Sequence, residues 1–291
     1  MKKFLIKGLV YSVLVTVLLN LFALLVFEAH KASKFYKPSF IVNTVSNQTY
    51  DYIILGSSMG LTSINTNLVD ELTGLNGLNA SMDDTSFATH YLMLKHFVEN
   101  QGKTKKCFVA INPSDISNPS PSYSTNDYRF LPFIHNAYVF REINNREEGL
   151  NPMKLSFYQP FIATSYYNVE LTATAMQAFL YPEKRNRFDD KGNFSYPVAG
   201  TPPKNKFNQE ILSWKNPYIA LMESLALENE IELIYYQPPI FNTEVLNNDS
   251  SKKIINHANV LKNADLFYDK IHVNKFGREE ISIKFAGDLR I

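Results

Sequence analysis

Between residues 51 and 112, short apolar runs alternate with longer segments whose apolar positions recur every three or four residues. The short runs are typical of buried strands, and the longer segments are typical of helices, two of which end near Gly74 and Gly102. Strands are predicted at 51–57, 75–81 and 105–112, and helices at 65–74 and 84–103. Strands that alternate with helices favour an α/β fold.

The alternation stops after residue 112 and resumes near residue 216. Residues 113–205 are rich in Pro, Asn, Ser, Tyr and Phe and show one helical segment, 168–180. A long irregular stretch inside a domain is typical of a lid or a substrate-binding insertion. After it, helices are predicted at 216–230, 251–264 and 274–290, and strands at 231–239 and 266–269.

These elements predict one domain, 51–291, with an insertion at about 113–205. Right-handed crossovers between successive strands would give a mainly parallel five-stranded sheet with helices on both faces. We therefore expect a flavodoxin-like, three-layer α/β/α arrangement. In such sheets, ligands bind beyond the carboxyl ends of the strands.

The N-terminal segment has a different pattern, because residues 8–27 carry no charge and follow three lysines, Lys2, Lys3 and Lys7. Twenty apolar residues are enough for a helix to cross a bilayer core of about 30 Å. The lysines place the N-terminus in the cytoplasm and the main domain outside it. We expect 1–27 to be a cytoplasmic tip with a transmembrane anchor in the plasma membrane, and 28–50 to be a stalk. A cleaved signal peptide, which would release the domain as a secreted or periplasmic protein, is the alternative.

Composition narrows the function classes. The net charge of +1 gives no electrostatic basis for binding nucleic acid. Cys107, the single cysteine, excludes an internal disulfide and a thiolate metal site, and its apolar surroundings favour a buried, inert thiol. The sequence shows no glycine-rich phosphate loop and no cluster with metal-ligand spacing, so we expect neither a cofactor nor a metal.

The chemistry is expected at the polar residues that follow the predicted strands. These residues are Gly56, Ser57, Ser58, Asn79, Ala80, Ser81, Asn112, Gln237, Asp269 and His272. A serine needs a histidine base and an acid that orients the histidine in order to act as a nucleophile. His272 lies three residues after Asp269, a spacing that lets both side chains come from one loop. The plainer interpretation is that Ser57 and Ser58 cap a helix, and that Asp269 is a cap beside a surface histidine.

The segments "ILGSSMG" and "DKIHVNKFG" resemble the first and last motif blocks of the SGNH (GDSL-like) hydrolase superfamily, in particular its membrane-anchored members that act on the cell envelope. The resemblance implies that Ser58 is the nucleophile, His272 the base and Asp269 its orienting acid. Ser57 stands where the family usually has Asp.

The resemblance also implies an oxyanion hole. Its donors would be the backbone N–H of Ser58, the backbone N–H of Ser81 and the side chain of Asn112, with Gly77 as the alternative to Ser81. Ala110 and Pro113 replace the Gly and Asp that flank the asparagine in the family motif. Donors of this kind stabilise the negative charge that develops on a substrate carbonyl oxygen.

The resemblance implies a membrane-anchored, extracytoplasmic serine acyl-esterase or O-acyltransferase. Its expected substrate is an acylated cell-envelope or exported polysaccharide, or another ester, processed through an acyl-enzyme. The expected partners are this substrate, the membrane through residues 8–27, and an envelope-modifying complex. The alternative is an inactive SGNH-fold protein that serves as a binding or assembly component of such a complex.

Overall fold

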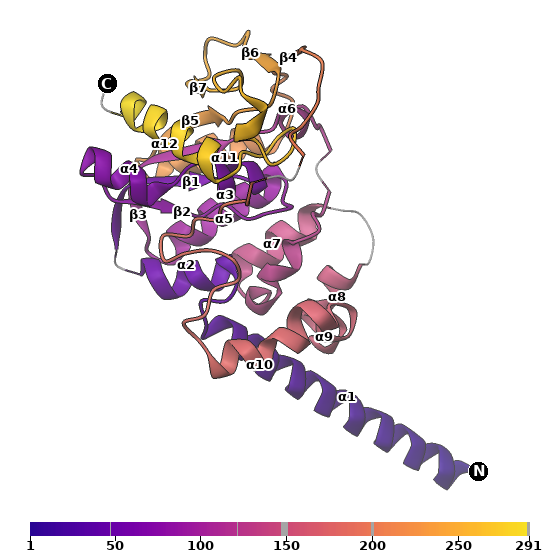
Figure 1. Cartoon of the computed structure of the whole chain (residues 1–291). Coiled ribbons are helices and arrows are strands. Elements are labelled where there is room, and N and C mark those ends of the chain that lie inside the picture. The colour runs from indigo at the N-terminus through magenta and orange to yellow at the C-terminus, as the bar shows by residue number, and fades with distance from the viewer. Residues whose placement is uncertain (47, 121, 147–150, 199–200, 290–291) are drawn as a thin grey trace. The chain divides into compact units, whose positions relative to one another are not determined.

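The structure is a computed structural model that describes residues 1–46, 48–120, 122–146, 151–198 and 201–289. The chain forms two compact units (Figure 1). One unit combines Met1–Asn43 with Asp127–Arg185 and is helical. The other combines Thr44–Asn126 with Asn186–Ile291 and contains the sheet. We call them the helical unit and the α/β unit.

A five-stranded sheet is the centre of the α/β unit. All four of its strand pairs are parallel, in the order β2-β1-β3-β5-β7. Its strands are β1 (Thr49–Leu55), β2 (Gly77–Asn79), β3 (Lys103–Ala110), β5 (Glu232–Gln237) and β7 (Ile254–Asn256). The predicted α/β class and the mainly parallel five-stranded sheet are confirmed.

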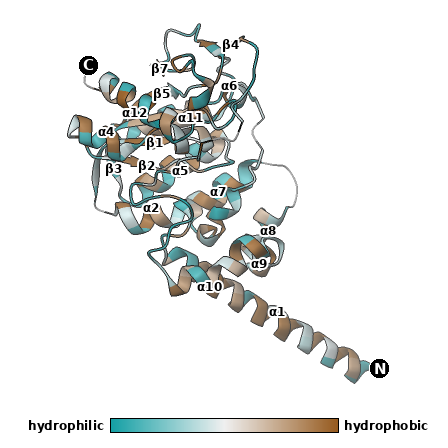
Figure 2. Ribbon diagram, viewed as in Figure 1, coloured by the Kyte–Doolittle hydropathy of each residue, from teal (hydrophilic) through white to brown (hydrophobic). Residues whose placement is uncertain are grey.

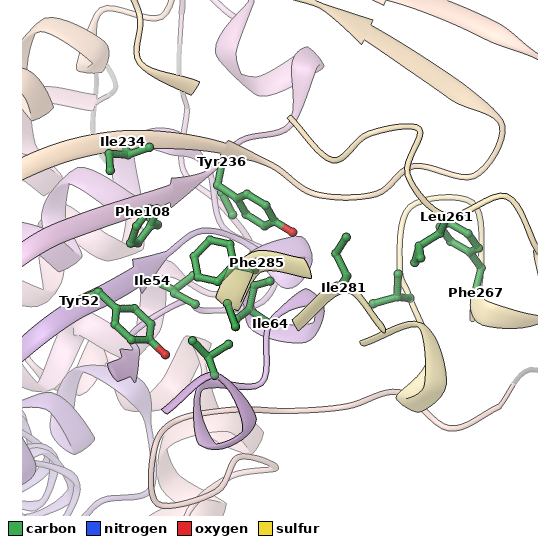
Figure 3. Packing of buried hydrophobic residues seen from close by; sticks show 14 residues of the cluster. Tyr52, Ile54, Ile64, Phe108, Ile234, Tyr236, Leu261, Phe267, Ile281 and Phe285 are labelled. Atoms are coloured by element: carbon green, nitrogen blue, oxygen red, sulfur yellow. The ribbon is translucent and has the colours of Figure 1, made fainter. Parts of the chain in front are cut away.

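The core packs where apolar side chains of the central strands meet the last helix. Phe285 of that helix lies with its ring centroid 5.0 Å from that of Phe108 on β3 and 5.3 Å from that of Tyr236 on β5, both edge-on (Figure 3). Tyr52 of β1 approaches the same ring at 6.4 Å. Burying aromatic rings of this size removes a large apolar area from water and fixes the last helix on the sheet.

Most helices of the α/β unit lie where the sequence pattern predicts them. The helices of this unit are α3 (Ser58–Ser63), α4 (Thr66–Thr73), α5 (Phe87–Glu99), α6 (Pro113–Ile116), α11 (Tyr218–Glu228), η3 (Ala264–Leu266) and α12 (Lys275–Leu289). α4 packs against α12, and α5 packs against α11. The predictions for α4, α5, α11 and α12 are confirmed, although Arg290 of the last predicted helix lies outside the described residues. The short helices α3 and α6, each of which follows a strand after two residues, and the short helix η3 were not predicted.

The predictions of a helix at 251–264 and of a strand at 266–269 are both wrong. The fifth strand is instead β7, because the β-branched pair Ile254 and Ile255 aligns with Tyr235 and Tyr236 of β5. Phe267 forms only an isolated antiparallel bridge with Val273, so its segment turns back on itself before α12. A second, two-stranded parallel sheet, β4 (Asn208–Ile211) with β6 (Thr243–Leu246), was also not predicted.

The helical unit contains the N-terminal helix and most of the predicted insertion. Its elements are α1 (Lys2–Lys31), α2 (Lys37–Val45, which ends in the α/β unit), η1 (Asp127–Phe133), α7 (Ala137–Arg146), α8 (Pro152–Tyr158), α9 (Phe161–Tyr166), η2 (Asn168–Thr172) and α10 (Ala173–Leu180). Inside it, Arg146 and Asp127 form a buried ion pair at 2.7 Å. Residues 28–50, which we expected as a stalk, include all of α2 and the start of β1.

α1 is long and apolar enough to cross a membrane. Its 30 residues correspond to about 45 Å of helix, more than the roughly 30 Å of a bilayer core. Hydropathy colouring shows it mostly brown, meaning apolar, along its length (Figure 2).

Candidate active site

Ser58 is the first residue of α3 and follows β1 by a two-residue turn. The turn is tight because Gly56 and Gly60 let the backbone approach the end of β3. A Cβ on Gly60 would meet Ser81 Oγ at 2.7 Å and Ala110 Cβ at 2.9 Å, and a Cβ on Gly56 would meet Ala110 Cβ at 2.8 Å. Distances this short are not tolerated, so the two glycines and the small Ala110 together fix where Ser58 lies.

The loop before α12 holds Asp269 and His272 in one rigid turn. Oδ1 of Asp269 accepts the backbone N–H groups of Ile271 and His272, both at 2.9 Å. Oδ2 lies 2.8 Å from Nδ1 of the His272 ring. Both carboxylate oxygens are therefore used to orient the histidine and its backbone.

Asn274 and Gly277 join this loop to α12. The Asn274 side chain donates to the carbonyl of Asp265 at 2.7 Å and accepts the backbone N–H groups of Phe276 at 3.0 Å and Gly277 at 3.2 Å. It thereby caps the helix. A Cβ on Gly277 would lie 2.1 Å from the carbonyl oxygen of Leu266, so only glycine fits there.

The hydroxyl of Ser58 and the ring of His272 meet. Ser58 Oγ lies 2.7 Å from Nε2 of His272. With the Nδ1 proton donated to Asp269, the Nε2 lone pair accepts the Ser58 hydroxyl. The structure therefore brings all three predicted catalytic side chains into one hydrogen-bonded series, Asp269–His272–Ser58. This series has the geometry that a general base needs in order to take a proton from a serine.

The pKa of Asp269 lies below its ordinary value. Partial burial acts to raise it, but the hydrogen bonds from the His272 ring and from the backbone N–H of Ile271 outweigh that effect. Asp269 is therefore ionised at neutral pH. An ionised carboxylate holds the proton on Nδ1 of His272 and leaves Nε2 free to act as a base.

Asn112 has an amide group available for a ligand. It follows β3 and caps α6, with its Oδ1 accepting the N–H of Ser114 at 3.1 Å and the Ser114 hydroxyl at 2.9 Å. Among the described residues, its Nδ2 group has no hydrogen-bond acceptor. The cap uses the oxygen of the amide and leaves the donor side unused, as a side-chain oxyanion donor requires.

Of the two backbone N–H groups predicted to donate to the oxyanion, one is free and the other is already hydrogen-bonded. Within the described part of the chain, the N–H of Ser58 has no acceptor, as expected in the first turn of a helix. The N–H of Ser81, in contrast, donates to Oδ1 of Asn79 at 3.0 Å. The alternative, Gly77, has its N–H bound to the carboxylate of Asp70. The structure thus leaves the donors of Ser58 and Asn112 free and engages those of Ser81 and Gly77.

Two tyrosines beside His272 were not predicted. The ring of Tyr196 lies 5.1 Å from the ring of His272 and stacks almost parallel on Tyr268, at 4.4 Å and 8°. The backbone of Tyr196 is fixed because its carbonyl accepts the N–H of Lys275. Burial, followed by the nearby charges of Asp269, Asp83 and Asp84, raises the pKa of Tyr196, so its phenol stays neutral. No sequence pattern pointed to Tyr196, because it lies in a stretch without periodicity. Tyr268 could have been suspected only because it directly precedes Asp269.

Another histidine–carboxylate pair is separate from this series. Nε2 of His257 lies 2.7 Å from Asp288, and its Nδ1 faces the hydroxyl of Tyr236 at 3.4 Å. This pair joins the loop after β7 to the end of α12 and faces a phenol rather than a serine. Within the described residues, no group of three or more His, Cys, Asp or Glu side chains could hold a metal ion.

No protein-family model matches the chain, and no curated protein matches it at a significant level.

Proposed function

We propose that the protein is a serine acyl-esterase or O-acyltransferase of the SGNH hydrolase superfamily. The observation that carries the proposal is the series Asp269–His272–Ser58, with both contacts of the His272 ring at 2.7–2.8 Å. The strand order β2-β1-β3-β5-β7 has the same form as the doubly wound order 2-1-3-4-5, which supports a flavodoxin-like three-layer fold.

The proposed reaction has two steps. Ser58 Oγ attacks the ester carbonyl carbon while Nε2 of His272 takes the hydroxyl proton. The tetrahedral intermediate collapses, and His272 returns the proton to the departing alcohol, which leaves the acyl group on Ser58. Water or a sugar hydroxyl then attacks the acyl-enzyme, with His272 again taking and returning a proton. Asp269 stays ionised and stabilises the imidazolium that forms in each step.

The oxyanion would be stabilised by the backbone N–H of Ser58 and by Nδ2 of Asn112. Each such donor contributes several kcal/mol when it is aimed at the developing charge, about 3–4 kcal/mol in well-studied hydrolases. Ser81 would contribute its N–H only if Asn79 releases it.

We propose an acylated cell-envelope or exported polysaccharide as the substrate. The stacked pair Tyr196 and Tyr268 supports this choice, because flat aromatic faces bind the apolar faces of sugar rings. The apolar helix α1 supports an enzyme tethered to the plasma membrane, and the N-terminal lysines favour a cytoplasmic N-terminus with the residues that follow α1 outside.

One observation favours a second candidate function. Because the N–H of Ser81 is bound to Asn79, the predicted three-donor oxyanion hole has two free donors. A protein that keeps the fold but lacks turnover would serve as a binding or assembly component of an envelope-modifying complex.

Turnover separates the two candidates. Purified full-length protein in detergent should release acetate from p-nitrophenyl acetate and from an O-acetylated polysaccharide. Ser58→Ala should reduce kcat by about 10⁶-fold, or to background. The matched control is Ser57→Ala, which removes the neighbouring hydroxyl and should retain activity within about threefold. Equal rates for wild type and Ser58→Ala would reject the proposed enzymatic function, and the binding or assembly component would then be the remaining candidate.

A further inference from the structure

The helical unit exposes apolar side chains in one short segment. Apart from Met1 and the side chains of α1, seven large apolar side chains described in this unit are exposed, each by 57–72%, and all seven lie between residues 158 and 181. They are Tyr158, Tyr166, Val169, Met176, Phe179, Leu180 and Tyr181. A contiguous apolar surface on a water-soluble unit usually marks a binding face.

The segment is also poor in charge. Of the 24 residues 159–182, only Glu170 is charged, and charges return at once with Glu183, Lys184 and Arg185. On η2 and α10, Val169, Ala173, Met176 and Leu180 follow helical spacing and are exposed, whereas Ala175 and Ala178 are buried. The helix therefore has an outward apolar stripe and an inward stripe of small residues.

This segment packs directly along α1. Asn20 donates its amide to the side chain of Gln159 at 2.7 Å and accepts the backbone N–H of Phe161 at 3.3 Å. Ten residues further along α1, the ring of His30 binds the carbonyl of Leu171 at 2.9 Å. α9, η2 and α10 all contact α1.

These contacts overlap the C-terminal part of the uncharged run of α1, residues 20–27. Ala23, Val26, Phe27 and His30 form one buried face at helical spacing. On the opposite side, Leu25 remains 70% exposed. Residues 20–27 of the uncharged run thus have one face covered by the segment and the other face open, over about 10 Å of helix.

We propose that residues 158–181, which we call the membrane collar, insert into the outer leaflet of the bilayer beside α1. The proposal rests on the membrane anchor proposed above and does not depend on catalysis. The bilayer is the occupant because the collar continues the apolar surface of α1, packs against its uncharged run, and ends where charges return. An amphipathic segment lies about 5–10 Å deep at this boundary, and Tyr158, Tyr166 and Tyr181 suit the headgroup level.

The collar would hold the helical unit on the membrane surface, so this unit would contact the bilayer through residues 158–181 as well as through α1.

Site-specific fluorescence tests this proposal with the full chain. Cys107 is fully buried, and burial raises the pKa of its thiol, so an added surface cysteine is labelled selectively. Single variants Met176→Cys and Phe179→Cys carry the environment-sensitive dye NBD. The protein is reconstituted in vesicles of equal parts phosphatidylcholine and phosphatidylglycerol, with or without lipid brominated in its acyl chains. Leu14→Cys reports on the anchor, and Leu227→Cys, on an exposed apolar position of α11, is the matched control.

The proposal predicts that brominated lipid reduces NBD emission at 176, 179 and 14 at least about twofold, while aqueous iodide quenches only the dye at 227. Iodide quenching at 176 and 179 equal to that at 227 would overturn it. Protection from iodide without quenching by brominated lipid would also overturn it, because a second copy or another protein would then cover the collar. Quenching at 14 alone would preserve the anchor and reject the collar. If brominated lipid quenches none of these positions, both fail.

Discussion

Ser58 Oγ lies 2.7 Å from Nε2 of His272, although the two residues are 214 positions apart in the chain. The fold brings them together because α3 begins at the end of β1, and the loop before α12 returns to the same place. Asp269 on that loop fixes the ring of His272 from its other side. This arrangement has the geometry that a serine nucleophile and its histidine base require.

Replacing Asp269 by Asn should remove most of the activity. An amide cannot hold the Nδ1 proton of His272 as a carboxylate does, so kcat/KM should fall about 10³- to 10⁴-fold with little change in fold. Steady-state hydrolysis of p-nitrophenyl acetate measures the loss. A loss below about tenfold would show that His272 does not depend on this carboxylate.

The same substitution has a pH signature in stability. Because the pKa of Asp269 is lower in the folded protein than its ordinary value of 3.8, its ionised form stabilises the fold above about pH 4. This contribution is lost as the pH falls through the lowered pKa. The difference in Tm between wild type and Asp269→Asn should therefore be present at pH 7 and shrink toward pH 3. A constant difference would contradict the assigned hydrogen bonds.

Gly60→Ala should destabilise the protein by about 1–3 kcal/mol, because the new Cβ would lie 2.7 Å from Ser81 Oγ and displace α3. The matched control is Gly287→Ala in α12, where nothing lies within 4 Å of the new Cβ. That change should stabilise the helix by about 0.5–1 kcal/mol. Urea unfolding of both variants measures the two shifts, and equal stability of Gly60→Ala and wild type would show that α3 does not need this close approach.

Asp115 should weaken the fold near neutral pH. Burial raises the pKa of Asp115 to about 6, although the backbone N–H of Phe87 partly offsets the effect. Between about pH 4 and 6 the folded state binds more protons than the unfolded state, so stability falls as the pH rises. Asp115→Asn should therefore exceed wild type in stability by about 1–2 kcal/mol at pH 7.5 and lose this advantage at pH 4. Thermal unfolding at the two pH values measures this, and an equal difference at both would contradict it.

Tyr268 should matter for large substrates only. Its ring forms the outer half of the stack with Tyr196 and is 38% exposed. Tyr268→Ala should lower kcat/KM for an acetylated polysaccharide about five- to tenfold and leave p-nitrophenyl acetate nearly unchanged, while Tyr268→Phe should behave as wild type. Equal losses on both substrates would show that the Tyr268 ring supports the loop that carries Asp269 and His272 and does not contact the polysaccharide.

Much of the fold could be predicted because it depends on local patterns. Short apolar runs such as 231–237 favour buried strands, and the spacing within α5 and α12 is helical, so four of the five sheet strands were identified. β7 was missed because three residues carry too little pattern, and its pairing with β5 is a tertiary effect. In the helical unit, α1 and the helical segment 168–180 were predicted, but α7, α8 and α9 were missed because they have only 6–10 residues each and carry too little pattern.

The site could be predicted in part. Ser58, Asp269 and His272 were identified because they lie at or just after the ends of predicted strands, and their roles were assigned because the segments that contain them resemble the first and last motif blocks of the SGNH superfamily. The sequence could not show that Asn79 would bind the N–H of Ser81, since that contact depends on a side-chain conformation. Nor could it place Tyr196 against His272, because the contact joins two loops far apart in the chain.

The most direct test of the central claim is covalent labelling of Ser58. Intact full-length protein in detergent is treated with a fluorophosphonate, digested and mapped by mass spectrometry. Our account predicts one adduct, on Ser58, that forms normally in Ser57→Ala and is lost in Ser58→Ala. It also predicts that His272→Ala slows adduct formation at least about 10³-fold. No labelling of the wild type, or equal labelling of Ser58→Ala, would contradict the claim that Ser58 is a nucleophile activated by His272.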